Sequence, residues 1–372
     1  MEVVITGVGL RSGFGDRETS WQRLCQGKTA IAPQAIFPEL PPLPLALIAA
    51  RPQSLPPLVQ VTVQAALSSS GLALPLRDCG VAIGSSRGAQ GELEQMRQDP
   101  AQLSQWPDRL LATATQTAAQ LIQARGPVAA PMAACATGLW AIAQGYEWLR
   151  QGICSRAIVG AVEAPLTPLT LASFKRMGAL APQGCYPFDC NRQGLVLGEG
   201  GAVFVLETRQ QAEARQAVLY GVIRGFGFTT DAYHVTAPNP VGTMAEKAVN
   251  DCLRRSQLTP AAIDYIHTHG TGTQRNDAQE SQLIQRLWRS QPIPVSSTKG
   301  ATGHTLGASG ALGLAFSLLA MRDQRLPPSV GLSNPAFPLN YVHQAQTAML
   351  DHCLVLSFGF GGQNAVLAVS RA

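Results

Sequence analysis

The sequence predicts an α/β fold, in which strands and helices alternate along the chain. Short apolar runs alternate with longer segments whose apolar residues recur at helical spacing. Several of the short runs end in glycine-rich turns. The 372 residues are 46% hydrophobic and 14% charged, which supplies enough apolar material for a large buried core. The alternation favours a mostly parallel sheet with helices on both sides.

The first half of the chain is expected to contribute strands and helices in equal measure. Apolar runs predict strands at 3–6, 79–83, 157–162 and 202–206. Helical spacing predicts helices at 21–27, 59–70, 104–124 and 139–149. A buried strand end is predicted at 128–132. The polar stretch 208–215 indicates a boundary between two domains, residues 1–209 and 210–372.

The second half of the chain shows the same alternation of predicted strands and helices. Strands are predicted at 218–223, 265–268, 294–298, 353–357 and 365–370, and helices at 244–256 and 308–321. Four glycine-rich turns follow strands of the two halves, and they contain Cys135, His269, Lys299 with His304, and Phe360. Because ligands of α/β proteins collect at the carboxyl ends of strands, we expect these side chains to meet.

Cys135 lies in a run of small residues, 131–138, where a strand is predicted to turn into a helix. Unpaired amides and the dipole at a helix N-terminus favour a thiolate there. The alternative for this residue is a buried cysteine that acts as a small apolar core side chain. The two histidines could likewise cap a strand or a helix, and Lys299 could be a solvated lysine.

Taken together, the four turns suit acyl transfer through a thioester. Cys135 would be the nucleophile, and the backbone N–H groups of Cys135 and Phe360 would form an oxyanion hole. Two neutral histidines, His269 and His304, can donate hydrogen bonds to one carbonyl oxygen. Those bonds would stabilise the enolate that forms when an adjacent carboxylate leaves as carbon dioxide. No ligands lie at metal spacing along the chain, so no metal site is expected.

Other functional classes have weaker signals in the sequence. Gly84–Gly88 matches the G-x-S-x-G pattern of serine hydrolases and would make Ser86 a nucleophile. Residues 7–13 imitate a dinucleotide fingerprint, but the spacing is off by one and no acidic residue follows at the required distance. We therefore expect a tight strand-to-loop turn there. The net charge of +5 includes no basic run, which argues against nucleic acid binding.

The compartment can also be inferred. The eight cysteines are scattered and never form Cys-x-x-Cys, which indicates free thiols in a reducing cytoplasm. The chain begins directly in a predicted strand, so no signal peptide is expected. The apolar run 310–321 is too short to cross a bilayer, so no membrane span is expected either.

Eight segments together resemble the β-ketoacyl-[acyl-carrier-protein] synthases of the thiolase superfamily: 5–9, 133–138, 187–189, 198–200, 231–238, 269–273, 297–304 and 357–362. The resemblance implies a five-layered α-β-α-β-α fold with two pseudo-symmetric halves, acyl carrier protein as partner and a homodimer. It implies no cofactor, since phosphopantetheine arrives on the carrier protein. In such a synthase, Cys135 takes an acyl chain, and malonyl carrier protein then decarboxylates and attacks it.

The same resemblance assigns roles to individual residues. His269 and His304 would bind the malonyl thioester carbonyl, and Lys299 would support the site by charge and hydrogen bonding. Thr271 and Thr273 would contact the phosphopantetheine arm, and Phe360 would gate the acyl pocket. Arg192 is a candidate for touching the carrier protein.

The sequence departs from the family nine positions after His304. A glutamate is normal there, but this chain has Gly313, and the missing carboxylate is expected to deprive Lys299 of a partner. Two pathways stay open: fatty-acid elongation, or a dedicated polyketide or polyene ketosynthase paired with a second subunit. A non-catalytic or chain-length-determining partner of a ketosynthase heterodimer is the alternative, because fold alone does not give activity.

Overall fold

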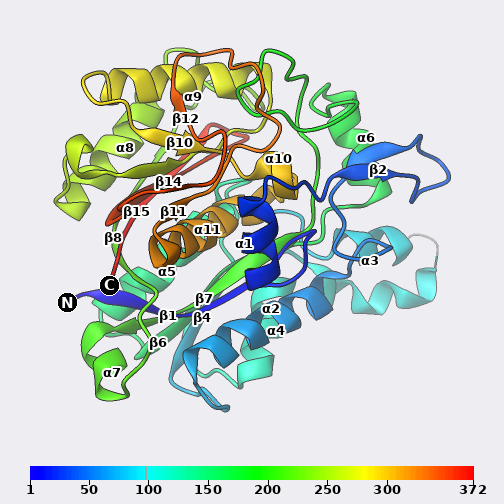
Figure 1. The fold of residues 1–372 in the computed structure, drawn as a ribbon. Helices are drawn as coiled ribbons and strands as arrows, with labels where there is room; N and C mark the ends of the chain where they lie inside the picture. Colours follow the sequence, from blue (N-terminus) through cyan, green and yellow to red (C-terminus); the bar gives the residue numbers. More distant parts are fainter. Residues whose placement is uncertain (97–98) are drawn as a thin grey trace.

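The computed structural model describes residues 1–96 and 99–372 (Figure 1). Eleven of its strands form one mixed sheet in the order β12-β10-β9-β14-β15-β8-β1-β7-β6-β4-β5. Five strand pairs of that sheet are parallel and five are antiparallel. The prediction of a mostly parallel sheet is therefore wrong, because the central strands pair with antiparallel neighbours.

The strands of this sheet come from both halves of the chain. The first half contributes β1 (Val3–Arg11), β4 (Cys79–Gly84), β5 (Val128–Ala129), β6 (Arg156–Glu163) and β7 (Gly200–Thr208). The second half contributes β8 (Gly221–Thr230), β9 (Tyr265–His267), β10 (Pro294–Ser296), β12 (Asn340–Tyr341), β14 (His352–Gly359) and β15 (Gln363–Ser370). Two small sheets pair β2 (Ala32–Gln34) with β3 (Leu43–Leu45), and β11 (Arg325–Leu326) with β13 (Gln346–Thr347).

The two halves of the sheet repeat one pattern of pairing. β1 is antiparallel to β7 and β7 to β6, whereas β4 is parallel to both β6 and β5. In the second half, β8 is antiparallel to β15 and β15 to β14, whereas β9 is parallel to both β14 and β10. β1 and β8 join the halves over a short antiparallel stretch. This repetition confirms two pseudo-symmetric halves.

Helices lie outside and between the two halves of the sheet. The first half contains α1 (Arg17–Cys25), α2 (Leu55–Ser70), α3 (Gln90–Met96), α4 (Thr113–Ile122), α5 (Thr137–Arg150), α6 (Pro168–Arg176) and α7 (Arg209–Ala214). The second contains α8 (Thr243–Ser256), α9 (Gln274–Leu287), α10 (Lys299–Thr302) and α11 (Ser309–Asp323). Three 3₁₀ helices are η1 (Pro100–Arg109), η2 (Pro260–Ala262) and η3 (Leu306–Ala308). The boundary predicted after residue 209 lies in α7.

These elements form five layers, as the resemblance implies (Figure 1). α2 and α4 cover the outer face of the first half of the sheet, and α8 and α9 cover that of the second half. α5 and α11 form the middle layer, and α11 is buried on every side from Ser309 to Met321. The apolar run at 310–321 is therefore a core helix. Within the described ranges, no helix combines the length and apolar character that crossing a membrane requires.

Gly7 and Gly9, two of the glycines that imitate a dinucleotide fingerprint, belong to β1, which continues to Arg11. The expected turn comes directly after the strand, where the backbones of Ser12 and Gly15 are hydrogen-bonded to each other around Gly13. A Cβ atom at Gly7 would lie 2.4 Å from the carbonyl oxygen of Ala66, and one at Gly9 would lie 2.1 Å from that of Thr62. Both carbonyls belong to α2. The glycines therefore allow close packing of a helix on a strand.

Two further predictions for the first half are wrong. The helix expected at 104–124 is η1 followed by α4, because Pro107 has no N–H to donate within a regular helix. The segment at 128–132 is not buried, since the side chains of Val128 and Met132 are 47% and 55% exposed. β5 forms the edge of the sheet, where one side has no neighbouring strand.

Candidate active site

A strained turn presents the thiol of Cys135 two residues before α5. Ala134 adopts a φ of +47°, which non-glycine residues rarely do and which often marks functional sites. The Thr137 hydroxyl holds the turn, because it donates to the carbonyl of Ala134 (2.6 Å) and accepts from the amide of Ala133 (2.9 Å). Ser357, on β14, donates to the carbonyl of Cys135 (2.9 Å). The second half of the chain therefore helps to fix the nucleophile.

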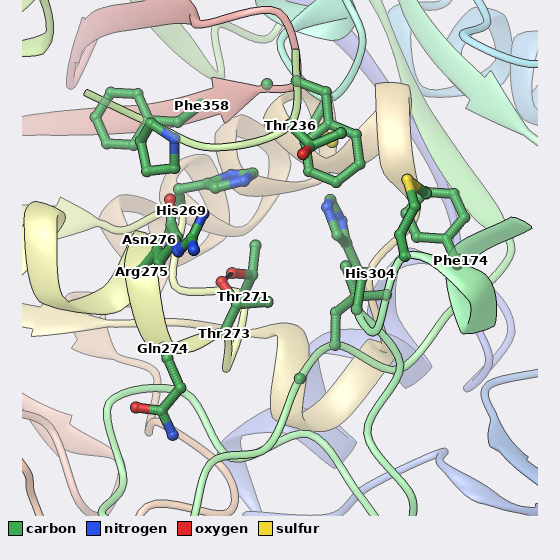
Figure 2. Close-up of a pocket in the computed structure, with 18 of the residues that line it drawn as sticks. Phe174, Thr236, His269, Thr271, Thr273, Gln274, Arg275, Asn276, His304 and Phe358 are labelled. Atoms are coloured by element: carbon green, nitrogen blue, oxygen red, sulfur yellow. Dashed lines mark hydrogen bonds between the residues drawn. The ribbon is translucent and has the colours of Figure 1, made fainter. Parts of the chain in front are cut away.

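Two imidazoles face this thiol from the other half of the molecule. His269 follows β9 and His304 follows α10, and their ring centroids lie 5.4 Å apart (Figure 2). The Cys135 sulfur and a ring nitrogen of each histidine all lie within 4.8 Å of one another. The structure thus brings together residues that are 134 and 35 positions apart in the sequence, as the strand-end argument predicts. The same donors suit a zinc ion, which spacing along the chain does not reveal.

Two carboxylates on α9, which the sequence analysis missed, position the backbone around His269. Glu280 accepts hydrogen bonds from the amides of His269 (2.6 Å) and Gly270 (2.7 Å). Asp277 accepts from the amides of Thr271 (3.1 Å) and Phe188 (2.8 Å). Their spacing of three places both on one face of a helix, and that was the signal available in the sequence.

Lys299 lies behind the thiol, outside the residues that line the cavity. Its side chain is 3% exposed, and its ammonium donates to the backbone carbonyl of His269. Burial lowers the pKa of Lys299, and it raises the pKa of Glu280 to about 7. The carboxyl and the ammonium oppose these shifts by mutual attraction.

Comparisons with known proteins identify the family of this chain. Two family models match the chain: "Beta-ketoacyl synthase, N-terminal domain" over residues 51–212 and "Beta-ketoacyl synthase, C-terminal domain" over residues 220–333. The 3-oxoacyl-[acyl-carrier-protein] synthase 2 of Coxiella burnetii is 33% identical over 407 residues, which cover 99% of this chain and 98% of that protein. This chain belongs to the β-ketoacyl synthase family.

Two solved structures resemble this β-ketoacyl synthase over its full length. One is a type II polyketide synthase acyl carrier protein in complex with its ketosynthase bound to the hexaketide. It has a TM-score of 0.93 and 25% identity, covering 100% of this chain and 99% of that one. The other is the ishigamide ketosynthase/chain length factor, with a TM-score of 0.91, 27% identity and the same coverage. The thiolase-like fold expected from the sequence is confirmed.

The two histidines of this β-ketoacyl synthase are neutral at physiological pH. Burial, and then the charge of Lys299, hold the pKa of both His269 and His304 well below the usual value for histidine. Nδ1 of His304 pairs with the hydroxyl of Ser309 at 2.7 Å. When Ser309 donates this bond, the proton of His304 is on Nε2 and can be donated to a ligand. Neutral imidazoles are the hydrogen-bond donors that an enolate requires.

The thiol does not have the low pKa that its place before a helix suggests. Burial raises the pKa of Cys135 to about 11, although Lys299 and the amide of Phe360 act in the opposite direction. The expectation of a stabilised thiolate is therefore wrong, because the loss of solvation outweighs the attraction of Lys299 and the hydrogen bond from the amide of Phe360. A neutral imidazole within 4.8 Å is available to accept the proton.

This raised pKa predicts the reactivity of the thiol. Iodoacetamide should alkylate Cys135 about tenfold faster for each unit of pH between 7 and 9, since the thiolate fraction grows by that factor below the pKa of about 11. Site-resolved mass spectrometry of the digested protein measures the rate, and the exposed Cys190 serves as an internal reference. A rate at Cys135 that levels off below pH 9 would contradict the raised pKa.

A cavity of about 390 Å³ opens onto the three reactive side chains. Thr271 and Thr273 line it, and their hydroxyls are paired at 2.8 Å (Figure 2). Phe360 also lines it and stacks on Phe174, with ring centroids 5.9 Å apart. The amide of Phe360 bonds the sulfur of Cys135 and so lies beside the carbon of any thioester formed there, near where its oxyanion would develop.

Two candidates from the sequence lie elsewhere. Arg192 is 7% exposed, stacks on Phe337 and lies beside Asp277, so its side chain is not available to a docking partner. Ser86 does not line the cavity, and its hydroxyl donates to the buried carboxylate of Glu163 (2.5 Å). Ser86 therefore lacks the histidine partner that a hydrolase needs, and nothing in its surroundings supports that alternative.

Proposed function

We propose that this chain catalyses decarboxylative Claisen condensation of an acyl group on Cys135 with malonyl-acyl carrier protein. The products are β-ketoacyl-acyl carrier protein and carbon dioxide. The observation that carries the proposal is the meeting of one thiol and two neutral imidazoles within 4.8 Å in one cavity. A hydrolase would need one histidine and an acid, whereas an enolate needs two hydrogen-bond donors.

The reaction proceeds in two stages. The Cys135 sulfur attacks the acyl thioester, and its proton goes to the departing thiol of the carrier protein. The malonyl thioester then loses carbon dioxide, and the electrons of the broken C–C bond form an enolate whose oxygen accepts hydrogen bonds from His269 and His304. The enolate carbon attacks the Cys135 thioester, the thiolate leaves, and the condensed chain stays on the carrier protein.

The other residues support these stages. Lys299 and Glu280 hold the backbone of His269, and the amides of Cys135 and Phe360 bind the oxyanion of the thioester. The paired hydroxyls of Thr271 and Thr273 suit the amide groups of a phosphopantetheine arm. That arm is a substrate group brought by the carrier protein, and the two stages proposed here use no resident cofactor or metal.

The same proposal covers partners and location. The carrier protein in the solved ketosynthase complex supports acyl carrier protein as partner, and the ketosynthase/chain length factor structure keeps a second subunit open beside a homodimer. The pathway is fatty-acid elongation or polyketide or polyene synthesis. All eight cysteines are free thiols, which fits the cytoplasm.

Acyl loading tests the proposal. The protein is incubated with acyl carrier proteins that bear chains of different length, and its intact mass is then measured. We expect one acyl group per chain, mapped to Cys135, and the chain that loads fastest identifies the pathway. Later addition of malonyl-acyl carrier protein should release that group as β-ketoacyl product.

A Cys190→Ser variant is the matched control, because it removes an exposed thiol without touching the cavity. Absence of loading would favour the non-catalytic partner subunit. Labelling of Ser86 by a fluorophosphonate, with no acyl group on Cys135, would favour the hydrolase.

A further inference from the structure

A third buried histidine, His267, lies directly behind the reactive pair. It ends β9 and precedes His269 by two residues. Its side chain is 2% exposed, and it is not among the residues that line the cavity. The sequence analysis did not single it out, and the roles proposed above do not use it.

The ring of His267 connects the two segments that carry His269 and Lys299. Its Nε2 is 3.1 Å from the hydroxyl of Thr298, the residue that precedes α10 and Lys299. A threonine hydroxyl can donate or accept, so the contact is a hydrogen bond for either tautomer of the ring. This bond fixes the position of the start of α10 relative to the end of β9.

The opposite edge of the ring lies against Gly313 of α11. A Cβ atom at Gly313 would lie 2.7 Å from Nδ1 of His267 and 2.9 Å from its Cε1, closer than side chains can approach. Nδ1 is buried and has no hydrogen-bond partner within the described part of the chain. The imidazole therefore occupies the space that a side chain at position 313 would need.

This packing explains the departure noted at Gly313. The glutamate expected there would overlap the ring, so glycine at 313 and histidine at 267 depend on each other. Burial and the charge of Lys299 lower the pKa of His267 to about 3, which keeps the ring neutral. A neutral ring thus fills the place where a carboxylate was expected. Among the charged groups near Lys299, the carboxylate of Glu280 has the largest effect on the pKa of Lys299.

We propose that His267 is a positioning residue for the decarboxylation step, and that it sets the placement of His269 and Lys299 by bridging Thr298 and Gly313. The proposal rests on the proposed function. Because Lys299 donates to the carbonyl of His269, a shift of the turn at Thr298 would move both groups. Cys135 is held by Thr137 and Ser357 instead, so its acylation should be insensitive to His267.

The test measures the two stages separately in the full-length protein. In His267→Ala, decarboxylation of malonyl-acyl carrier protein should fall about 10- to 100-fold, whereas loading of Cys135 should change less than about threefold. His267→Gln should restore decarboxylation to within about threefold of wild type, because the glutamine amide can extend to the position that Nε2 of His267 occupies and can hydrogen-bond Thr298 there. His267→Leu fills space without that bond and should not restore it.

A double-mutant cycle checks the contact with Gly313. Gly313→Ala should impair decarboxylation in the wild-type background, where the new methyl group meets the ring, and should have a smaller effect in His267→Ala. Ile266→Ala is the matched control, because it removes the neighbouring buried side chain of β9. Ile266 belongs to a hydrophobic cluster of the second half of the chain and does not take part in the bridge between Thr298 and Gly313. The melting temperature of this variant should fall, and the ratio of the two rates should stay at the wild-type value.

The outcomes separate this inference from the proposed function. Equal losses of loading and decarboxylation in His267→Ala would assign His267 a purely structural role. Failure of His267→Gln to restore decarboxylation would do the same. Additive effects in the cycle would overturn the link to Gly313. A wild-type protein that neither loads nor decarboxylates would overturn the proposed function, and this inference with it.

Discussion

Replacement of Cys135 by alanine is expected to abolish acyl loading and to lower condensation on the order of 10⁴-fold or more. Among the described residues that line the cavity, Cys135 is the only thiol that can carry the acyl chain as a thioester, and no imidazole replaces that bond. Decarboxylation of malonyl-acyl carrier protein should persist within about tenfold of wild type, because Glu280 still holds the backbone of His269 and Ser309 still holds the ring of His304. Product analysis and carbon dioxide release measure the two activities.

Cys252→Ala is the matched control for this variant. Cys252 is another buried thiol, on α8, that is not among the residues lining the cavity, and its loss should leave both activities near wild type. Condensation that survives in Cys135→Ala would show that the acyl chain is carried elsewhere.

The second large effect is expected for His304→Ala. Loss of one of two hydrogen-bond donors to the enolate should reduce decarboxylation about 10²- to 10³-fold. Because the pKa of both histidines lies well below 6.5, neither should become charged as the pH falls from 8 to 6. Any change of the wild-type rate over that interval is expected from Glu280, whose pKa is about 7. A histidine with an ordinary pKa would become charged over that interval, and the rate would change.

His352→Ala controls for loss of an imidazole as such, since His352 is bonded to Ser370 at the far end of β14. Wild-type decarboxylation in His304→Ala would rule out a pair of neutral donors.

The sequence predicts the reactive set well because each member lies in a glycine-rich turn that follows a predicted strand. Cys135, His269, His304 and Phe360 all line one cavity, and Lys299 lies just behind it. A strand followed by a glycine-rich turn is a pattern of a few adjacent residues, so these reactive residues can be found from local sequence alone.

The supporting residues escaped prediction for a physical reason. α9 begins with polar residues, Gln274 to Asp277, which face the site and carry no apolar periodicity. Its carboxylates, Asp277 and Glu280, are buried by tertiary packing that no local window shows. His267 was missed in the same way, because its role depends on Gly313, 46 positions later.

Burial also explains two errors at the site itself. The thiol of Cys135 was judged by its local sequence, as a helix-terminal thiolate, and Arg192 was taken from the family resemblance as a contact for the carrier protein. Each is enclosed by segments distant in sequence, which changes the pKa of the first and the accessibility of the second.

The middle layer has a consequence for how the molecule assembles. α5 comes from the first half and α11 from the second, and they pack so closely that a Cβ atom at Gly138 would lie 2.8 Å from the amide of Ala311. A chain cleaved between residues 209 and 210 would leave each fragment with one apolar helix exposed to water. Neither fragment would be a working unit, and transfer of an acyl group to Cys135 would report that the two had recombined.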